Sequence, residues 1–270
     1  MFSRAKNGRI KIDGTDMHYI AFGKGKGTLI MIPGLSDGLT TVKGKAAVFS
    51  RLYKEYSKTH RVYVFSRRNI LPEDFTSRDM ARDVKSAMDI LGITQADVLG
   101  VSQGGTVAQY LALDYPDAVR RLVLAVTYAR PNDTVNTVVS KWIGFAQAGD
   151  HGNLMIDTAE HSYSAAYLDK YRKYYPLLGK IGRPKGYDRF INMAKACLEH
   201  NCFDRLGEIK CPTLIIGGGD DRIVTCAASV MMSTAISASR LYVYPQYGHA
   251  AYEEAKDFNR RVLEFITQQP

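Results

Sequence analysis

Short apolar runs alternate with helical patterns over the first half of the 270-residue chain, and this rhythm restricts the possible folds most. The apolar runs lie at 28–33, 61–65, 96–100 and 121–126. Helical spacing of apolar residues predicts helices over 46–56, 77–91 and 104–113. Strands that are apolar throughout and joined by helices predict the α/β fold class, with a mostly parallel sheet covered on both faces. We also expect an antiparallel edge hairpin over 8–22.

The rhythm breaks near residue 128. Helical patterns follow at about 133–147, 161–175 and 187–200, with no clear strand among them. Strands at 213–216 and 240–244 and a helix over 251–267 then complete the alternation. We therefore predict a core made of residues 1–130 and 209–270, with residues 131–208 as a helical insertion.

The segment Gly100-Val-Ser-Gln-Gly104 fits the pattern G-x-S-x-G and lies between a predicted strand and a predicted helix. A turn sharp enough to lift a serine hydroxyl clear of the sheet leaves no room for side chains two positions before and after it, which explains glycine at both. Ser102 is therefore the candidate nucleophile, and it needs a nearby base.

With this motif in this context, the chain resembles the α/β-hydrolase superfamily over nearly its whole length. The resemblance implies a triad in the chain order Ser, acid, His. His249, in the loop after the last predicted strand, matches the place of the base. Asp220 and Asp221 both follow the penultimate strand, and Gly218 with Ile223-Val224 favours Asp221.

The resemblance also implies an oxyanion hole formed by the backbone amides of Leu35 and Gln103. Pro33 stands where the family commonly has His, so the hydrogen bonds of that His are lost while the Leu35 amide remains. The family's Asp-x-x-Gly-x-Gly-x-Ser run is missing after Phe65. Arg67 and Arg68 occur there instead, and we expect them to be a solvated pair.

In such a fold the insertion covers the active site as a lid and shapes the substrate pocket. Its candidate substrate-binding residues are Trp142, Tyr163, Tyr167 and Tyr171. The tyrosines recur every four residues and so form one stripe on a helix. Such a stripe packs in a core more often than it binds a substrate, although a phenol leaves a polar tip available.

The function predicted is a serine hydrolase that cleaves carboxylic esters through an acyl-enzyme. In it Ser102 attacks, His249 shuttles the proton and Asp221 orients His249. The same triad serves thioesterases, lactonases, iminopeptidases, C–C hydrolases and perhydrolases, and a low-turnover ligand-binding receptor can share the fold. The expected partner is a small-molecule ester or related acyl compound, and no metal or organic cofactor is implied.

Composition narrows the classes further. Hydrophobic residues make up 46% and charged residues 23% of the chain, as in globular proteins. No apolar run approaches the roughly 18 residues of a membrane span, and the basic start lacks an apolar stretch, so we expect a cytoplasmic protein without a secretory signal. Cys197, Cys202, Cys211 and Cys226 lack zinc-ligand spacing and are expected to be reduced thiols.

The net charge of +9 is concentrated near the start, where residues 1–60 carry eleven Lys and Arg against four acidic residues. No nucleic-acid-binding motif accompanies this charge, so we expect a solvated face and no nucleic-acid partner. An interfacial lipase with this face against an anionic membrane is a further alternative.

Overall fold

The computed structural model describes residues 5–180 and 182–268; the ends of the predicted core, residues 1–4 and 269–270, and residue 181 of the insertion lie outside it. The described residues form one sheet of eight strands in the order β1-β2-β4-β3-β5-β6-β7-β8. The strands are β1 (Lys6–Ile12), β2 (Thr15–Phe22), β3 (Gly27–Ile32), β4 (His60–Arg68), β5 (Ala96–Val101), β6 (Val119–Ala125), β7 (Thr213–Gly218) and β8 (Ser239–Tyr244). As predicted, β1 and β2 form an antiparallel edge hairpin. In the order of the sheet, the strands β4, β3, β5, β6, β7 and β8 pair in parallel with their neighbours.

Helices follow most strands. They are α1 (Ala46–Leu52), α2 (Ser77–Ile90), α3 (Gln103–Asp114), α4 (Asp133–Gln147), α5 (His151–Ser162), α6 (Ala165–Tyr171), α7 (Tyr175–Leu178), α8 (Asp188–Glu199), α9 (Cys226–Ala235), α10 (Ala251–Glu254) and α11 (Phe258–Thr267). Side-chain caps define several starts: the Thr76 hydroxyl accepts from the Asp79 amide at 3.1 Å before α2, and Asn132 Oδ1 accepts from the Val135 amide at 2.9 Å before α4.

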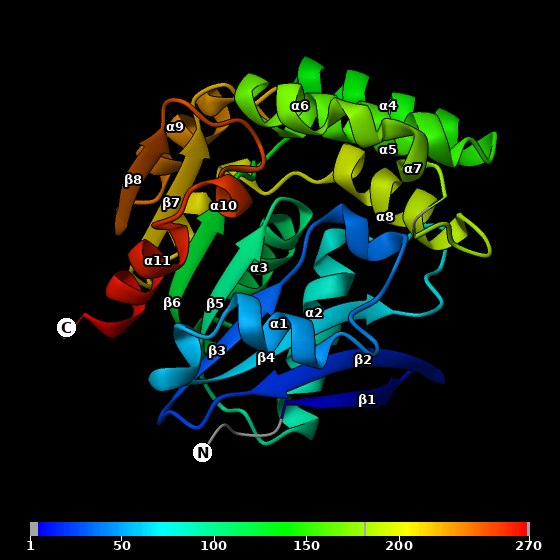
Figure 1. The fold of residues 1–270 in the computed structure, drawn as a ribbon. Coiled ribbons are helices and arrows are strands. Elements are labelled where there is room, and N and C mark those ends of the chain that lie inside the picture. The colour runs from blue at the N-terminus through cyan, green and yellow to red at the C-terminus, as the bar shows by residue number, and fades with distance from the viewer. Residues whose placement is uncertain (1–4, 181, 269–270) are drawn as a thin grey trace.

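Two hydrophobic clusters explain why the central strands are apolar throughout. In β3, Leu29 and Met31 join residues of α1 and α11 on one face of the sheet, whereas Ile30 and Ile32 join residues of α2, α3 and α9 on the other. Alternate strand residues point to opposite faces, so a sheet covered on both faces buries every position. Figure 1 shows α1 and α11 on the near side of the sheet and α2 and α3 behind it.

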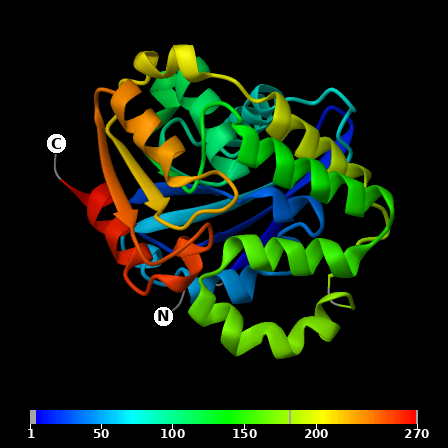
Figure 2. The same ribbon diagram turned by 90° about the horizontal axis from the view of Figure 1, so that it is seen from above.

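The helices α4 to α8 lie between β6 and β7 in the chain and beyond the upper ends of these strands in Figure 1. Figure 2 looks onto these helices from above. Because parallel strands present their carboxyl ends at one edge of the sheet, this layer adjoins the turn that follows β5. No helix in the described part of the chain is both long and apolar enough to cross a bilayer.

Three predicted helices are wrong in their bounds. The helix predicted over 46–56 ends at Leu52. The pattern at 161–175 belongs to α5, α6 and α7, because the Ser164 hydroxyl caps a new helix by accepting from the Tyr167 amide at 3.3 Å. The predicted helix at 251–267 is interrupted between α10 and α11, where Ala255 adopts an extended backbone. The sequence patterns do not predict α9.

Candidate active site

Ser102 occupies a sharp turn between β5 and α3. Its backbone has φ 53° and ψ −123°, a conformation that costs a residue with a side chain about 1–3 kcal/mol. The Ser102 amide donates to the Ala125 carbonyl at 2.9 Å, and the Gly105 amide donates to the Ser102 carbonyl at 2.7 Å, which holds the turn in place. Ser102 remains half-buried, so its hydroxyl is not sealed in the core.

Close packing explains why both predicted elbow positions are glycine. A Cβ atom at Gly100 would lie 2.4 Å from the Gly104 carbonyl oxygen, and one at Gly104 would lie 1.9 Å from the Ile32 carbonyl oxygen. Both distances are far below van der Waals contact, and the obstructing atoms are backbone. The turn can therefore close only without a side chain at Gly100, and it can approach β3 only without one at Gly104.

The structure brings the three predicted triad side chains into one hydrogen-bonded chain. Ser102 Oγ lies 2.9 Å from His249 Nε2, and His249 Nδ1 lies 2.9 Å from Asp221 Oδ2. An ionised carboxylate can only accept, so Nδ1 donates to Asp221 and Nε2 is left to accept from the serine hydroxyl. This arrangement can remove the Ser102 proton as its oxygen attacks an electrophilic carbon.

Asp221, not Asp220, contacts the imidazole. Asp221 is 7% exposed, and its Oδ1 accepts from the amides of Ile223 and Val224 at 2.9 Å each. Burial acts to raise the pKa of Asp221, but the electrostatic interaction and hydrogen bond with His249 and the hydrogen bonds from these two amides outweigh it and lower the pKa. Asp220 is exposed and pairs with Arg222 at 2.5 Å.

The two predicted oxyanion donors come from different parts of the chain. Leu35 opens a short 3-10 turn, Leu35–Gly38, within a segment 33–38 that we call the oxyanion loop. A Cβ at the preceding Gly34 would lie 3.7 Å from Ser102 Oγ, so the loop runs beside the nucleophile. Gln103 is the first residue of α3. Among the described residues, neither amide donates a hydrogen bond to the protein, so both are available to an oxyanion.

The oxyanion loop itself contains a buried acid, and no sequence motif points to it. Asp37, only 3% exposed, accepts from Ser66 Oγ at 2.6 Å, from the Arg67 amide at 2.9 Å and from Arg189 Nη2 at 2.6 Å. Arg189 lies on α8 and also donates to backbone carbonyls of the loop and of β4. One carboxylate thus ties the oxyanion loop to β4 and to the inserted helices.

The expectation of a solvated arginine pair is wrong. Arg67 and Arg68 are 2% and 5% exposed, because β4 continues three residues beyond the apolar run and carries both into the interior. Arg68 forms a buried ion pair with Asp83. Arg67 Nη2 donates to the Pro33 carbonyl at 2.6 Å and to Gln103 Oε1 at 3.4 Å. Burial lowers the pKa of Arg67 to about 10, against the opposing effect of Asp37.

The four candidate substrate-binding residues of the insertion contact residues other than the triad. Trp142 is buried and donates from Nε1 to Asp157 at 2.9 Å. Tyr163, Tyr167 and Tyr171 are half-buried. The rings of Tyr163 and Tyr167 stack with centroids 4.1 Å apart, and the ring of Tyr171 is tilted against that of Tyr167 with centroids 4.3 Å apart. Among the described residues, no hydrogen bond or ring contact joins these four side chains to the triad. Their role in substrate binding therefore stays a prediction.

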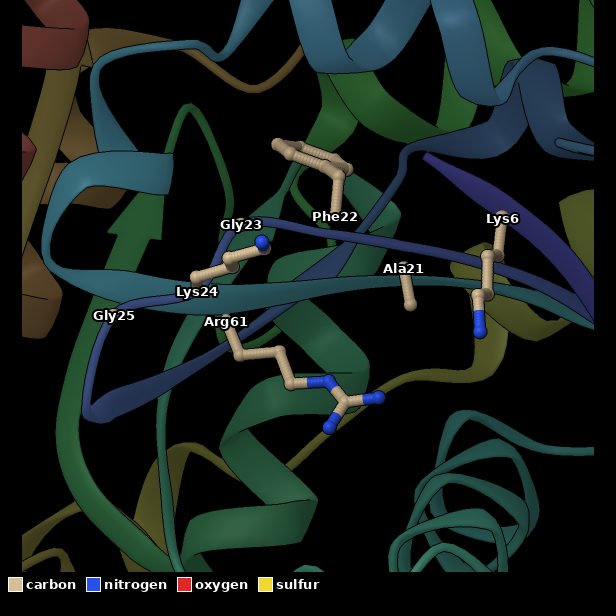
Figure 3. A pocket seen from close by; sticks show the side chains of 7 residues that line it. All are labelled: Lys6, Ala21, Phe22, Gly23, Lys24, Gly25 and Arg61. Atoms are coloured by element: carbon tan, nitrogen blue, oxygen red, sulfur yellow. The ribbon is translucent and has the colours of Figure 1, made fainter. Parts of the chain in front are cut away.

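A hollow of about 380 Å³ opens at a different edge of the sheet (Figure 3). It is lined by Lys6, Ala21, Phe22, Gly23, Lys24, Gly25 and Arg61. These residues lie near the amino ends of β3 and β4, whereas Ser102 follows the carboxyl end of β5. In residues 5–180 and 182–268, no group of three or more His, Cys, Asp or Glu side chains is arranged to hold a metal ion.

Known proteins share this architecture. The model of the α/β hydrolase fold family matches residues 27–256. A 2-hydroxy-6-oxononadienedioate/2-hydroxy-6-oxononatrienedioate hydrolase of Pseudomonas putida is 28% identical over 98% of this chain and 95% of its own length. The solved structure of MGS-M2, an α/β hydrolase enzyme from a deep-sea metagenome library, has a TM-score of 0.86 at 24% identity and covers 97% of this chain and 98% of its own. An enol-lactonase from Burkholderia xenovorans has a TM-score of 0.81 at 22% identity and covers 97% and 100%.

Proposed function

The chain belongs to the α/β-hydrolase family, and we propose that it is a serine hydrolase that cleaves carboxylic esters through an acyl-enzyme. The observation that carries the proposal is the unbroken hydrogen-bond chain from Ser102 through His249 to Asp221 on a strained elbow. Structural histidines and aspartates form pairs elsewhere in this chain, as His60 and Asp97 do. The elbow serine adds a nucleophile to such a pair.

The reaction proceeds in two steps, acylation of Ser102 and hydrolysis of the acyl-enzyme. Ser102 Oγ attacks the acyl carbon while His249 Nε2 takes the hydroxyl proton, and Asp221 stabilises the resulting imidazolium. The amides of Leu35 and Gln103 bind the oxygen of the tetrahedral intermediate, which collapses as His249 protonates the departing alcohol. Water then attacks the acyl-enzyme, again giving a proton to His249, and the acid leaves as the Ser102 hydroxyl re-forms.

A carbon–carbon bond hydrolase is the second candidate, because the Pseudomonas putida relative is named for a substrate with two carboxylates. Such a dianion needs cations with free N–H groups in the site. Arg189 already donates to Asp37 and to carbonyls of β4, and Arg67 is enclosed beneath Pro33. Arg189 is occupied by these contacts, and the Nε and Nη1 atoms of Arg67, unpaired among the described residues, are buried. Neither guanidinium therefore presents N–H groups to a substrate carboxylate, which favours a neutral ester.

We propose that residues 131–208 act as a lid over the core formed by residues 1–130 and 209–270. The inserted helices attach to both sides of the candidate site. The Ala250 amide, next to His249, donates to the Ser162 carbonyl at 2.8 Å at the end of α5. On the other side, Arg189 of α8 pairs with Asp37 of the oxyanion loop at 2.6 Å.

The test is hydrolysis of a p-nitrophenyl ester series from acetate to decanoate by the wild type and by Ser102→Ala, with a 2-hydroxy-6-oxo-dienoate as the carbon–carbon substrate. We expect turnover of the esters and a loss in Ser102→Ala on the order of 10⁶-fold in kcat. The preferred acyl length measures the depth of the pocket. Higher kcat/KM for the dienoate than for every ester would replace the ester proposal by the second candidate.

A further inference from the structure

We propose that Arg67 is a positioning residue for the oxyanion hole, a role that rests on the serine-hydrolase function proposed above. A single nitrogen, Nη2, lies 2.6 Å from the Pro33 carbonyl oxygen and 3.4 Å from Gln103 Oε1. Pro33 leads into the loop that presents the Leu35 amide, and Gln103 presents the other amide. One guanidinium nitrogen thus contacts both segments that carry the proposed oxyanion-hole amides.

Hydrogen bonds hold the backbone of Arg67 in place. The Arg67 amide donates to Asp37 Oδ2 at 2.9 Å, and the Arg67 carbonyl accepts from Arg189 Nη2 at 2.9 Å, so the end of β4 is held on both edges. The Gln103 side chain is held from the far side, where its Nε2 donates to the Met193 carbonyl of α8 at 2.6 Å. The contacts of Arg67 therefore connect groups that have little freedom of their own.

The proline in the oxyanion loop makes this contact necessary. Pro33 has no N–H and no polar side chain, so its carbonyl is the group by which this position can be held. A shift of about 1 Å in a group that stabilises the transition state can lower the rate about 100-fold. Loss of the Arg67 contact frees the carbonyl two residues before the Leu35 amide.

The same guanidinium is poorly satisfied as a structural group. Its Nε and Nη1 atoms are buried and find no hydrogen-bond partner among the described residues. A buried cation with unpaired donors does not favour folding, and an apolar side chain of similar length can replace it at little loss of stability. Arg68 differs, because its removal leaves the buried Asp83 carboxylate without this partner. The two adjacent arginines therefore separate a functional role from a structural one.

The experiment compares Arg67→Met with Arg68→Met, using the p-nitrophenyl ester that the wild type prefers. For Arg67→Met we expect kcat to fall about 10- to 100-fold with KM changed less than about threefold, because the contact acts on the transition state. Its thermal midpoint is expected to equal or exceed that of the wild type. For Arg68→Met we expect a lower thermal midpoint and an unchanged kcat per folded molecule.

A second readout follows formation of the tetrahedral adduct directly. Diethyl p-nitrophenyl phosphate reacts with Ser102 Oγ, forming an O–P bond and releasing p-nitrophenolate while His249 takes the proton. The phosphoryl oxygen then occupies the oxyanion hole, so inactivation of Arg67→Met should slow by a factor similar to its loss in kcat. If Arg67→Met does not fold, Arg67→Gln, which keeps an N–H donor but not the two-point contact, is expected to show the same losses.

Folded Arg67 variants with wild-type kcat and wild-type inactivation rates would overturn this inference while leaving the hydrolase function intact, provided Ser102→Ala is inactive. A fall in activity that only follows the folded fraction would overturn it as well. Retained hydrolysis in Ser102→Ala would instead refute the proposed function on which it rests.

Discussion

The neighbouring residues Asp220 and Asp221 occupy opposite environments, which makes them a matched pair for mutation. Asp221 is buried against His249, whereas Asp220 is exposed and pairs with Arg222. We expect Asp221→Asn to lower kcat about 10⁴-fold, because the imidazole loses its orienting carboxylate. Asp220→Asn should change kcat less than about threefold, since surface ion pairs contribute little. Steady-state ester hydrolysis measures kcat for both variants. A larger loss of kcat in Asp220→Asn than in Asp221→Asn would assign the triad acid to Asp220.

The lowered pKa of Asp221 links stability to pH. A carboxyl with a folded-state pKa below its unfolded value of about 3.9 stabilises the fold above that value and loses this contribution as pH falls through the folded pKa. We therefore expect the free-energy difference between the wild type and Asp221→Asn to shift against the wild type on acidification below about pH 4. Urea denaturation from pH 3 to 7 measures this difference. A constant difference across that range would contradict the assigned environment.

At the scale of the elements, the approach of the elbow to β3 makes a sharp stability prediction. A methyl group at Gly104 meets the Ile32 carbonyl at 1.9 Å, whereas one at Gly144 in α4 meets nothing within 4 Å. We expect Gly104→Ala to destabilise by about 3 kcal/mol or more, as overpacking against backbone does. Gly144→Ala should stabilise by about 0.5–1 kcal/mol, because glycine is a poor helix former. Chemical denaturation of both variants tests the pair, and equal effects would be inconsistent with the close approach of the elbow to β3.

The attachment of α8 to the oxyanion loop gives a second prediction at this scale. Arg189→Met leaves Asp37, whose side chain is 1% exposed, without its cation and should destabilise by about 3–5 kcal/mol. Arg172→Met is the matched control on the insertion, because Arg172 pairs with Glu160 at the surface. Its loss should change the free energy of unfolding far less than the loss of Arg189, because surface ion pairs contribute little to stability. Free energies of unfolding measure both. An effect of Arg189→Met as small as that of Arg172→Met would contradict the stabilising role of the Arg189–Asp37 ion pair.

At the scale of the whole molecule, local patterns predict the sheet and the order of its strands along the chain. The positions of Ser102, Asp221 and His249 follow from the elbow motif and the chain order of the family, and the structure places the three together. The Asp37–Arg189 pair cannot be predicted from the sequence, because it joins residues 152 positions apart that carry no motif. The burial of Arg67 is equally hidden, because hydropathy alone does not show that β4 continues through a polar segment.

Local sequence patterns also do not predict the short helices of the insertion. Their break at Ser162–Ser164 depends on contacts with residues 250–254, where the Ser164 hydroxyl donates to Glu254 Oε2 at 2.5 Å and Tyr163 donates to Glu253 at 2.6 Å. Tertiary contacts of this kind override helical periodicity.

Every catalytic step proposed for this protein depends on acylation of Ser102. Intact-protein mass spectrometry of an acid-quenched reaction with a p-nitrophenyl ester detects such an intermediate. We expect the wild type to gain the mass of one acyl group, a peptide map to place it on Ser102, and Ser102→Ala to gain none while turnover stops. Turnover in Ser102→Ala at the wild-type rate, or an acyl group on another residue, would contradict the proposed mechanism.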